Sequence, residues 1–183
     1  MQIEGGTGNG YAAGVTIGNR LKVSSTSFPL EHEVNHHDGL AFSFGVSLTP
    51  TGAGDCFLYI KNNSDLDMVV SEFMMNAASD ETISFKLGDE GTPTGGAEGT
   101  PVNRNAGSGN IADVTALSGV DITGLSGGGS VMGVFLKGGE SSIRRAPVSS
   151  FIVPKNKTIT GYVSSGAIQI KVGMGFSFHS TGH

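Results

Sequence analysis

The sequence lacks tryptophan, has a single cysteine and contains no apolar stretch close to the ~20 residues of a transmembrane helix. Because Cys56 stands alone, no disulfide can form within the chain, and its place in the apolar run from Cys56 to Ile60 predicts a buried side chain. The start of the chain is polar and rich in glycine, without basic residues ahead of an apolar segment. We therefore expect no secretion signal, no membrane partner and synthesis in a cytoplasm.

Charge is also scarce, since Asp, Glu, Lys and Arg make up 15% of the 183 residues, against about a quarter in typical soluble proteins. The formal net charge is −5 and the basic residues are scattered, which argues against a nucleic-acid partner. With 30 glycines and so few charges, the surface must consist largely of small polar side chains and backbone. Such a surface favours association, so we expect a homo-oligomer or a subunit of a larger assembly.

The chain does contain segments in which apolar residues alternate regularly with small or polar ones. From Ile168 to Phe178 every even position is apolar and every odd position is small or polar, and Leu40 to Leu48 shows the same pattern. A period of two over this length predicts β-strands with one face in a core. Turn-forming residues divide the chain into about eight to ten such strands, without a sustained helical period. The sequence therefore predicts an all-β fold, a two-sheet, jelly-roll-like β-sandwich, with a barrel as the alternative.

Two parts are expected along the chain. Residues 1–24 are predicted to form an extended N-terminal arm, and residues 25–183 a single β-sandwich domain. The domain is predicted to carry a long loop from Gly88 to Asn110, and ordered loops of this length are usually functional or docked on a partner. The carboxylate pairs Asp80-Glu81 and Asp89-Glu90 fall in predicted turns, where we expect them to be solvated.

Two motifs suggest chemistry. The run Gly124-Leu125-Ser126-Gly127-Gly128 matches the G-x-S-x-G elbow of serine hydrolases, but another predicted strand follows where the elbow requires a helix. The segment Glu31–Asp38 places His32, His36 and His37 beside carboxylates. It is compatible with a metal site, with a pH-sensitive contact, or with local hydrogen bonding alone. We expect no cofactor, no metal and no enzymatic activity.

A sugar-binding role would require exposed aromatic side chains. The chain has no tryptophan and only three tyrosines, and Tyr59 lies in the apolar run that ends at Ile60. A host-glycan site would therefore have to use Tyr11 or Tyr162, and glycan binding is kept as a further alternative.

Several short phrases of the chain resemble a family of tailed-bacteriophage virion structural proteins. They are Asn19–Ser24, Ser27–His32, His37–Leu40, Leu58–Leu66, Pro101–Asn105 and Gly107–Asn110. The resemblance implies a non-enzymatic component of the virion, assembled in the host cytoplasm, and supplies no catalytic residues. On this resemblance we interpret the chain first as a capsid decoration, or cement, protein, which binds the major capsid protein as a trimer and stabilises the head shell. The alternative is an adaptor or spike component of the tail, neck or baseplate.

In either position the arm and the 88–110 loop are the segments expected to reach neighbouring subunits. Ordering them costs about 1–2 kcal/mol per residue, so their contacts must bury apolar side chains to offset that cost. The candidate partner-binding residues lie near the start of the chain: Tyr11, Arg20, Phe28, Leu30, Val34, His36 and His37.

Overall fold

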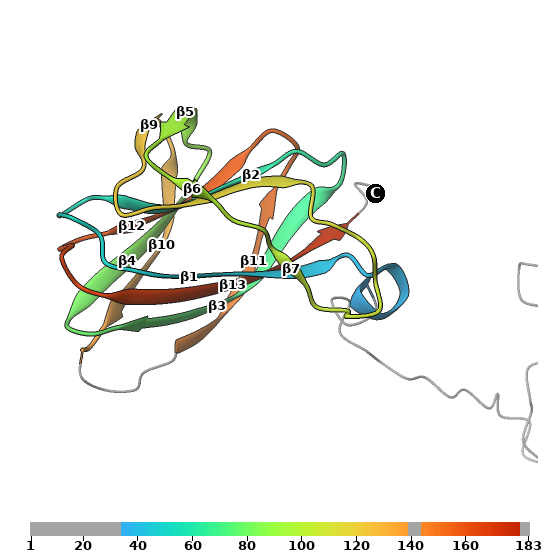
Figure 1. Cartoon of the computed structure of the whole chain (residues 1–183), viewed down its shortest axis with the longest axis horizontal. Helices are drawn as coiled ribbons and strands as arrows, with labels where there is room; N and C mark the ends of the chain where they lie inside the picture. Colours follow the sequence, from blue (N-terminus) through green and yellow to red (C-terminus); the bar gives the residue numbers. More distant parts are fainter. Residues whose placement is uncertain (1–33, 139–143, 180–183) are drawn as a thin grey trace, which may run out of the picture.

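The structure, a computed structural model, describes residues 34–138 and 144–179, and nearly all of its regular structure is β-strand (Figure 1). One π-helical turn, η1 (Val34–Asp38), precedes the strands. The strands are β1 (Ala41–Leu48), β2 (Cys56–Asn62), β3 (Asp67–Ala77), β4 (Glu81–Leu87), β5 (Glu90–Thr94), β6 (Ala97–Glu98), β7 (Val102–Asn103), β8 (Val114–Ser118), β9 (Thr123–Ser126), β10 (Gly129–Leu136), β11 (Arg144–Val153), β12 (Thr158–Val163) and β13 (Ile170–His179). The predicted arm, residues 1–24, lies outside the described residues.

Two large antiparallel sheets pack face to face (Figure 1). The first sheet has the strand order β11-β3-β13-β1-β7, and the second has the order β10-β4-β12-β2-β8-β6. A small ribbon of β5 and β9 lies beside the second sheet.

Eight strands of six residues or more carry the topology, namely β1 to β4 and β10 to β13. The first of these pairs with the last, the second with the seventh, the third with the sixth and the fourth with the fifth. This nested antiparallel pairing, divided between two sheets, is the jelly-roll topology. The predicted jelly-roll-like sandwich is therefore confirmed. The barrel alternative is wrong, because the two sheets stay separate and each ends in edge strands.

The core lies between the two sheets and uses the alternating positions that the sequence pattern indicates. In β13 the even-numbered residues of Ile170–Phe178 are all buried, and Phe42 and Phe44 are buried in β1. Across the sheets, the ring of Phe73 on β3 packs against that of Phe85 on β4, with centroids 4.2 Å apart. Burial of these large side chains supplies the main favourable free energy of folding.

The segment between β4 and β10 covers part of the outer face of the second sheet. It is not the continuous loop that the sequence predicts over residues 88–110, because β5, β6 and β7 lie within it. β6 pairs with β8 in the second sheet and β7 pairs with β1 in the first, so this segment docks on its own chain and links both sheets. A second apolar cluster forms here from Cys56, Tyr59, Leu117 and Ile122, with Leu125 and Tyr162 packed against it. This cluster explains why β2 is apolar on both faces, and it confirms that Cys56 and Tyr59 are buried.

Candidate functional site

The histidine segment folds as η1, the single π-helical turn. Within the described ranges, no group of three or more His, Cys, Asp or Glu side chains could hold a metal ion. His37 is exposed, whereas His32 and the side chain of His36 are outside the part of the chain that the structure describes. The metal-binding and pH-sensitive interpretations of this segment therefore stay predictions.

The G-x-S-x-G match does not have the local structure of a nucleophile elbow. Ser126 is the last residue of β9, and β10 begins at Gly129 after a short turn. An elbow needs a helix after the serine, so that backbone N–H groups point at the developing oxyanion. Here a strand follows a strand, and Ser126 lacks that arrangement.

Two carboxylates that the sequence assigns to solvent are buried. Glu81 is 1% exposed and Asp89 is 2% exposed, so the prediction of solvated turns is wrong for both. Burial by itself raises the pKa of Glu81, but hydrogen bonds outweigh it and leave this pKa below its ordinary value. The donors in the turn between β12 and β13 are the N–H groups of Ser164 (3.0 Å), Ser165 (3.0 Å) and Gly166 (3.1 Å) and the hydroxyl of Ser164 (2.8 Å).

Asp89 anchors the segment after β4 to the second sheet. Its carboxylate accepts hydrogen bonds from the hydroxyls of Thr160 (2.5 Å) and Tyr162 (2.7 Å) on β12 and from the N–H of Gly128 (2.7 Å). Burial raises the pKa of Asp89, and these hydrogen bonds together lower it by more, so that its pKa lies below the ordinary value. The ionised carboxylate thus holds a strand of the sheet and the turn before β10 together.

The side chain of Tyr162 interacts with two residues of its own chain. Its hydroxyl donates to Asp89, and the ammonium of Lys86 lies 4.1 Å from the centroid of its ring. Burial and the hydrogen bond to Asp89 raise the pKa of Tyr162 well above its ordinary value. One ring face and the hydroxyl are therefore used in the fold, and Tyr11, the other tyrosine considered for a sugar site, lies outside the described residues.

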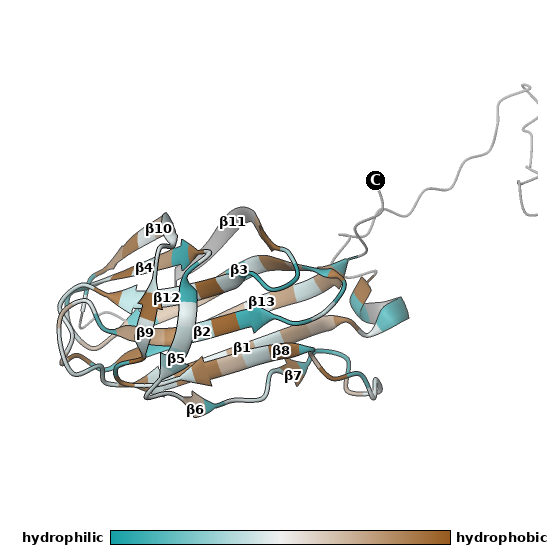
Figure 2. Ribbon diagram, turned by 90° about the horizontal axis from the view of Figure 1, so that it is seen from above, coloured by the Kyte–Doolittle hydropathy of each residue, from teal (hydrophilic) through white to brown (hydrophobic). Residues whose placement is uncertain are grey.

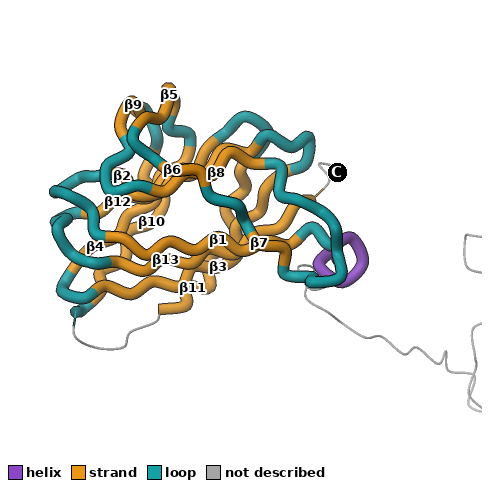
Figure 3. Tube along the Cα trace, in the orientation of Figure 1, coloured by secondary structure: helices purple, strands orange, loops and turns teal. Residues whose placement is uncertain are grey.

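At one end of the sandwich, asparagines join two segments that are about 70 residues apart in the sequence. In Figure 3 the loop that follows β7 runs beside the helical turn η1. Three side-chain amides, that of Asn103 at the end of β7 and those of Asn105 and Asn110 in the loop, donate to backbone carbonyls: Asn103 to Gly39 (2.7 Å), Asn105 to Asn35 (3.0 Å) and Asn110 to Asp38 (2.7 Å). We refer to these three residues and Asn35 as the asparagine patch. The patch ties η1 and Gly39 to the end of β7 and the loop that follows it.

The asparagine patch contains a buried polar atom that no hydrogen bond within the described residues satisfies. This atom is the side-chain oxygen Oδ1 of Asn35. A buried oxygen without a donor is costly, so a donor supplied at this position would bind favourably. Of the two predicted partner-binding residues that flank Asn35, Val34 is buried by its own domain. The predicted residues outside the described ranges are Tyr11, Arg20, Phe28 and Leu30.

Arg104 forms a brace over the outer face of the first sheet. Its Nε donates to the hydroxyl of Ser43 on β1 at 2.7 Å, and its Nη2 pairs with the carboxylate of Glu72 on β3. β13 lies between these two strands and has Gly175 beneath the guanidinium. A Cβ atom at residue 175 would lie 2.4 Å from Nη2 of Arg104, so glycine is required for this close approach.

We predict that Gly175→Ala displaces the guanidinium of Arg104 and lowers the free energy of unfolding by about 1 kcal/mol. Gly133→Ala is the matched control, because a Cβ atom there meets nothing within 4 Å. Urea unfolding of Gly175→Ala, Arg104→Ala and the double variant measures the effect. The two losses should not add, since both substitutions break the same brace. Fully additive losses would contradict this explanation.

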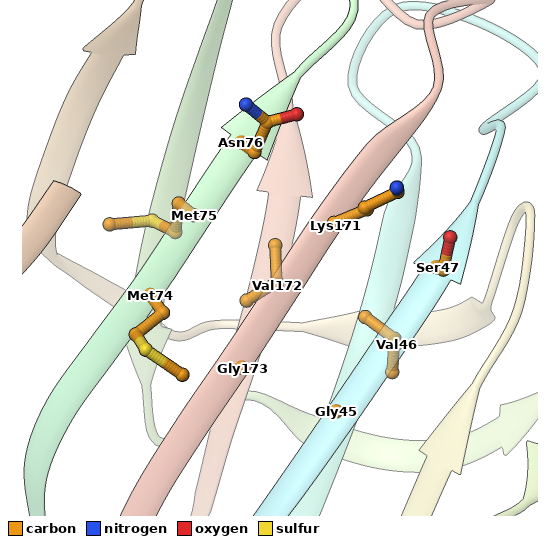
Figure 4. A pocket seen from close by; sticks show the side chains of 9 residues that line it. All are labelled: Gly45, Val46, Ser47, Met74, Met75, Asn76, Lys171, Val172 and Gly173. Atoms are coloured by element: carbon orange, nitrogen blue, oxygen red, sulfur yellow. The ribbon is translucent and has the colours of Figure 1, made fainter. Parts of the chain in front are cut away.

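Near the brace, the exposed face of the first sheet has a floor of glycines (Figure 4). Gly45 of β1 lies opposite Gly173 of β13, and Gly173 lies opposite Met74 of β3. The missing side chains leave a shallow groove of about 720 Å³, in which Lys171 is the only charged lining residue. The backbone of a neighbouring molecule can approach a strand closely where the strand has glycine.

The asparagines of the patch occur in the sequence as Asn103-Arg104-Asn105 and Gly109-Asn110, a local composition typical of turns in which side chains bind backbone groups. That signal predicts a structured turn, but it does not indicate which segment the amides contact.

The described part of the chain has no helix of the length and apolarity needed to cross a membrane. Comparisons with protein-family models, with curated proteins and with solved structures find no match to this chain. The candidate site is therefore identified from the geometry of the described residues and not from a related protein.

Proposed function

We propose that this chain is a non-enzymatic structural component of a tailed-bacteriophage particle, and specifically a decoration protein of the head. The observation that carries the proposal is the asparagine patch. Three phrases that resemble the virion family are joined by hydrogen bonds in the fold: Asn103 of Pro101–Asn105 and Asn110 of Gly107–Asn110 both donate to His37–Leu40, more than 60 residues earlier in the sequence. These three phrases therefore meet at one end of the sandwich, where a buried oxygen of Asn35 lacks a donor among the described residues.

The outer surface adds support for a role in an assembly. The glycine-floored groove is lined by nine residues of which one is charged, so a neighbour could pack on it at a small cost of desolvation. The jelly roll is also an architecture that viral capsid proteins use. This likeness of fold is an analogy, which supports an assembly role and names no partner.

The proposed mechanism is burial of surface across the junctions of capsid subunits. Each copy bound to the major capsid protein would add association free energy that the shell must lose before it opens. A trimer would multiply the attachment points, so that binding of one subunit raises the effective concentration of the others at the shell.

The copy number of this chain per purified particle tests the proposal, measured by quantitative mass spectrometry against the major capsid protein. Icosahedral symmetry predicts on the order of hundreds of copies for a decoration protein. A count of about a dozen or fewer would instead place the chain on the tail, neck or baseplate, because those structures have low cyclic symmetry. Absence from the particle would overturn the proposal.

A further inference from the structure

The two large sheets leave four edges among the described strands, formed by β11 and β7 in the first sheet and by β10 and β6 in the second. An edge strand presents unpaired N–H and C=O groups, and proteins usually shorten, bulge or charge such strands. β6 and β7 have two residues each. β11 contains two arginines and Pro147. Three of the four edges therefore carry features that discourage pairing.

β10 is the exception. Its eight residues include no proline and no charged side chain, and it pairs on one side with β4. Figure 2 shows β10 at the border of the sandwich. The pairing with β4 is regular from Met132 to Leu136, with one register shift between Ser130 and Met132. The other side of β10 has no strand partner among the described residues.

The outward face of β10 is apolar as well. Val131 is 40% exposed and Phe135 is 57% exposed, with the exposed Gly133 between them. Met132 and Val134 pack against the main core from the other face of the strand. β10 thus combines an open row of backbone hydrogen-bonding groups with an exposed apolar stripe, the combination that favours addition of another strand.

We propose that β10 pairs in antiparallel fashion with β10 of a second copy of this chain, with Gly133 of both copies at the two-fold axis. In this register Val131 of each copy lies opposite Phe135 of the other, and Met132 lies opposite Val134. Pairs of aromatic and β-branched side chains directly across two strands are favourable. The strand is therefore complementary to itself, as a two-fold contact requires.

The lack of charge on β10 favours a second copy of the chain as its partner. Each chain carries a net charge of −5, so two copies repel each other at long range, and they meet at the least electrostatic cost where neither presents a charge. β10 has no charged residue, and the proposed register places Lys137 of the two copies at opposite ends of the contact. The pairing would join two six-stranded sheets into one continuous sheet. It goes beyond the proposed function, because it concerns a contact between two copies of this chain and not the binding of the chain to the capsid.

Cysteine cross-linking of the otherwise intact chain tests the register. A Cβ atom at Gly133 meets nothing within 4 Å, so Gly133→Cys leaves the fold unstrained. Across the proposed axis the two new Cβ atoms would lie about 4.5–5.5 Å apart, close enough for a disulfide after a small adjustment. The native Cys56 is buried, and burial raises the pKa of its thiol to about 11, so it gives little background reaction.

Gly129→Cys is the matched control, because it lies on the same strand and also meets nothing within 4 Å. In the proposed register its two copies would be roughly 26 Å apart, at about 3.3 Å per residue. Mild oxidation, followed by non-reducing gel electrophoresis and intact mass spectrometry, should give a covalent dimer at least tenfold faster with Gly133→Cys than with Gly129→Cys. Equal rates would overturn the proposed register.

A second variant tests the contact without a covalent bond. Phe135→Lys should weaken self-association at least tenfold in sedimentation equilibrium, because it removes the aromatic side chain from both cross-strand pairs. Ile111→Lys is the control, since Ile111 is 79% exposed and lies outside β10. A wild-type chain that stays monomeric, or an oligomer unaffected by Phe135→Lys, would overturn the proposal.

Discussion

Replacing Glu81 with glutamine is expected to lower the free energy of unfolding by about 3 kcal/mol, because a buried, ionised acceptor is lost. Glutamine has nearly the same shape, but it presents an NH₂ group where one carboxylate oxygen accepts hydrogen bonds. The N–H groups of Ser165 and Gly166 bind different oxygens of Glu81, so either orientation of the amide leaves donors facing a donor. Urea unfolding at neutral pH measures the loss.

Glu98→Gln is the matched control for this substitution, since Glu98 is exposed in β6. We expect it to change stability by no more than about 0.5 kcal/mol, as surface substitutions usually do. An equal loss in both variants would contradict the role given to Glu81.

The same carboxylate should make stability depend on pH. Because the folded-state pKa of Glu81 lies below its ordinary value of 4.5, the unfolded chain binds the proton more readily. The stabilisation is therefore complete above the unfolded pKa and is lost as the pH falls through the folded pKa. We expect the difference between wild type and Glu81→Gln to shrink between about pH 5 and about pH 3. A difference that stays constant over this range would show that ionisation of Glu81 does not carry the effect.

Replacing Asp89 with alanine is expected to cost about 4 kcal/mol of unfolding free energy, because it leaves one buried and two partly buried donors without an acceptor and opens a small cavity. The hydroxyls of Thr160 and Tyr162 and the N–H of Gly128 all donate to this carboxylate. Thermal and urea unfolding should both show the loss. Asp113→Ala, at an exposed position, is the control and should have a small effect.

A double-mutant cycle separates the hydrogen bond from the cavity. Tyr162→Phe alone should cost about 1–2 kcal/mol, because it removes a hydrogen bond to a charged group. In the Asp89→Ala background the same change should cost much less, since the acceptor is already absent. Equal costs in both backgrounds would mean that Tyr162 stabilises the fold by packing alone.

The strands were predictable because alternation is a local property of the chain. The even positions of Ile168–Phe178 mark β13, and those of Leu40–Leu48 mark β1, within two residues of the observed bounds. The run from Cys56 to Ile60 is apolar on both faces, which correctly indicated a buried strand. Composition and turn spacing were sufficient for the two-sheet architecture, because strands with one apolar face must pack in pairs of layers.

The candidate site was harder to predict from the sequence, because the residues that interact there are far apart in the chain. Glu81 receives all but one of its hydrogen bonds from residues 83 to 85 positions later, and Asp89 receives one from Thr160, 71 positions later. Locally both carboxylates look like ordinary turn residues. The asparagines at the end of β7 and in the loop after it likewise signal a turn, and only the fold shows that they bind the segment before β1.

By itself, therefore, the sequence determined long core strands such as β1 and β13 and the face of each that enters the core, because a period of two fixes both. Only the tertiary structure decided which strands become edges, where glycines form an exposed floor, and which carboxylates are buried. Those features depend on the pairing of strands such as β4 with β12 and β1 with β7, which brings together groups separated by dozens of residues.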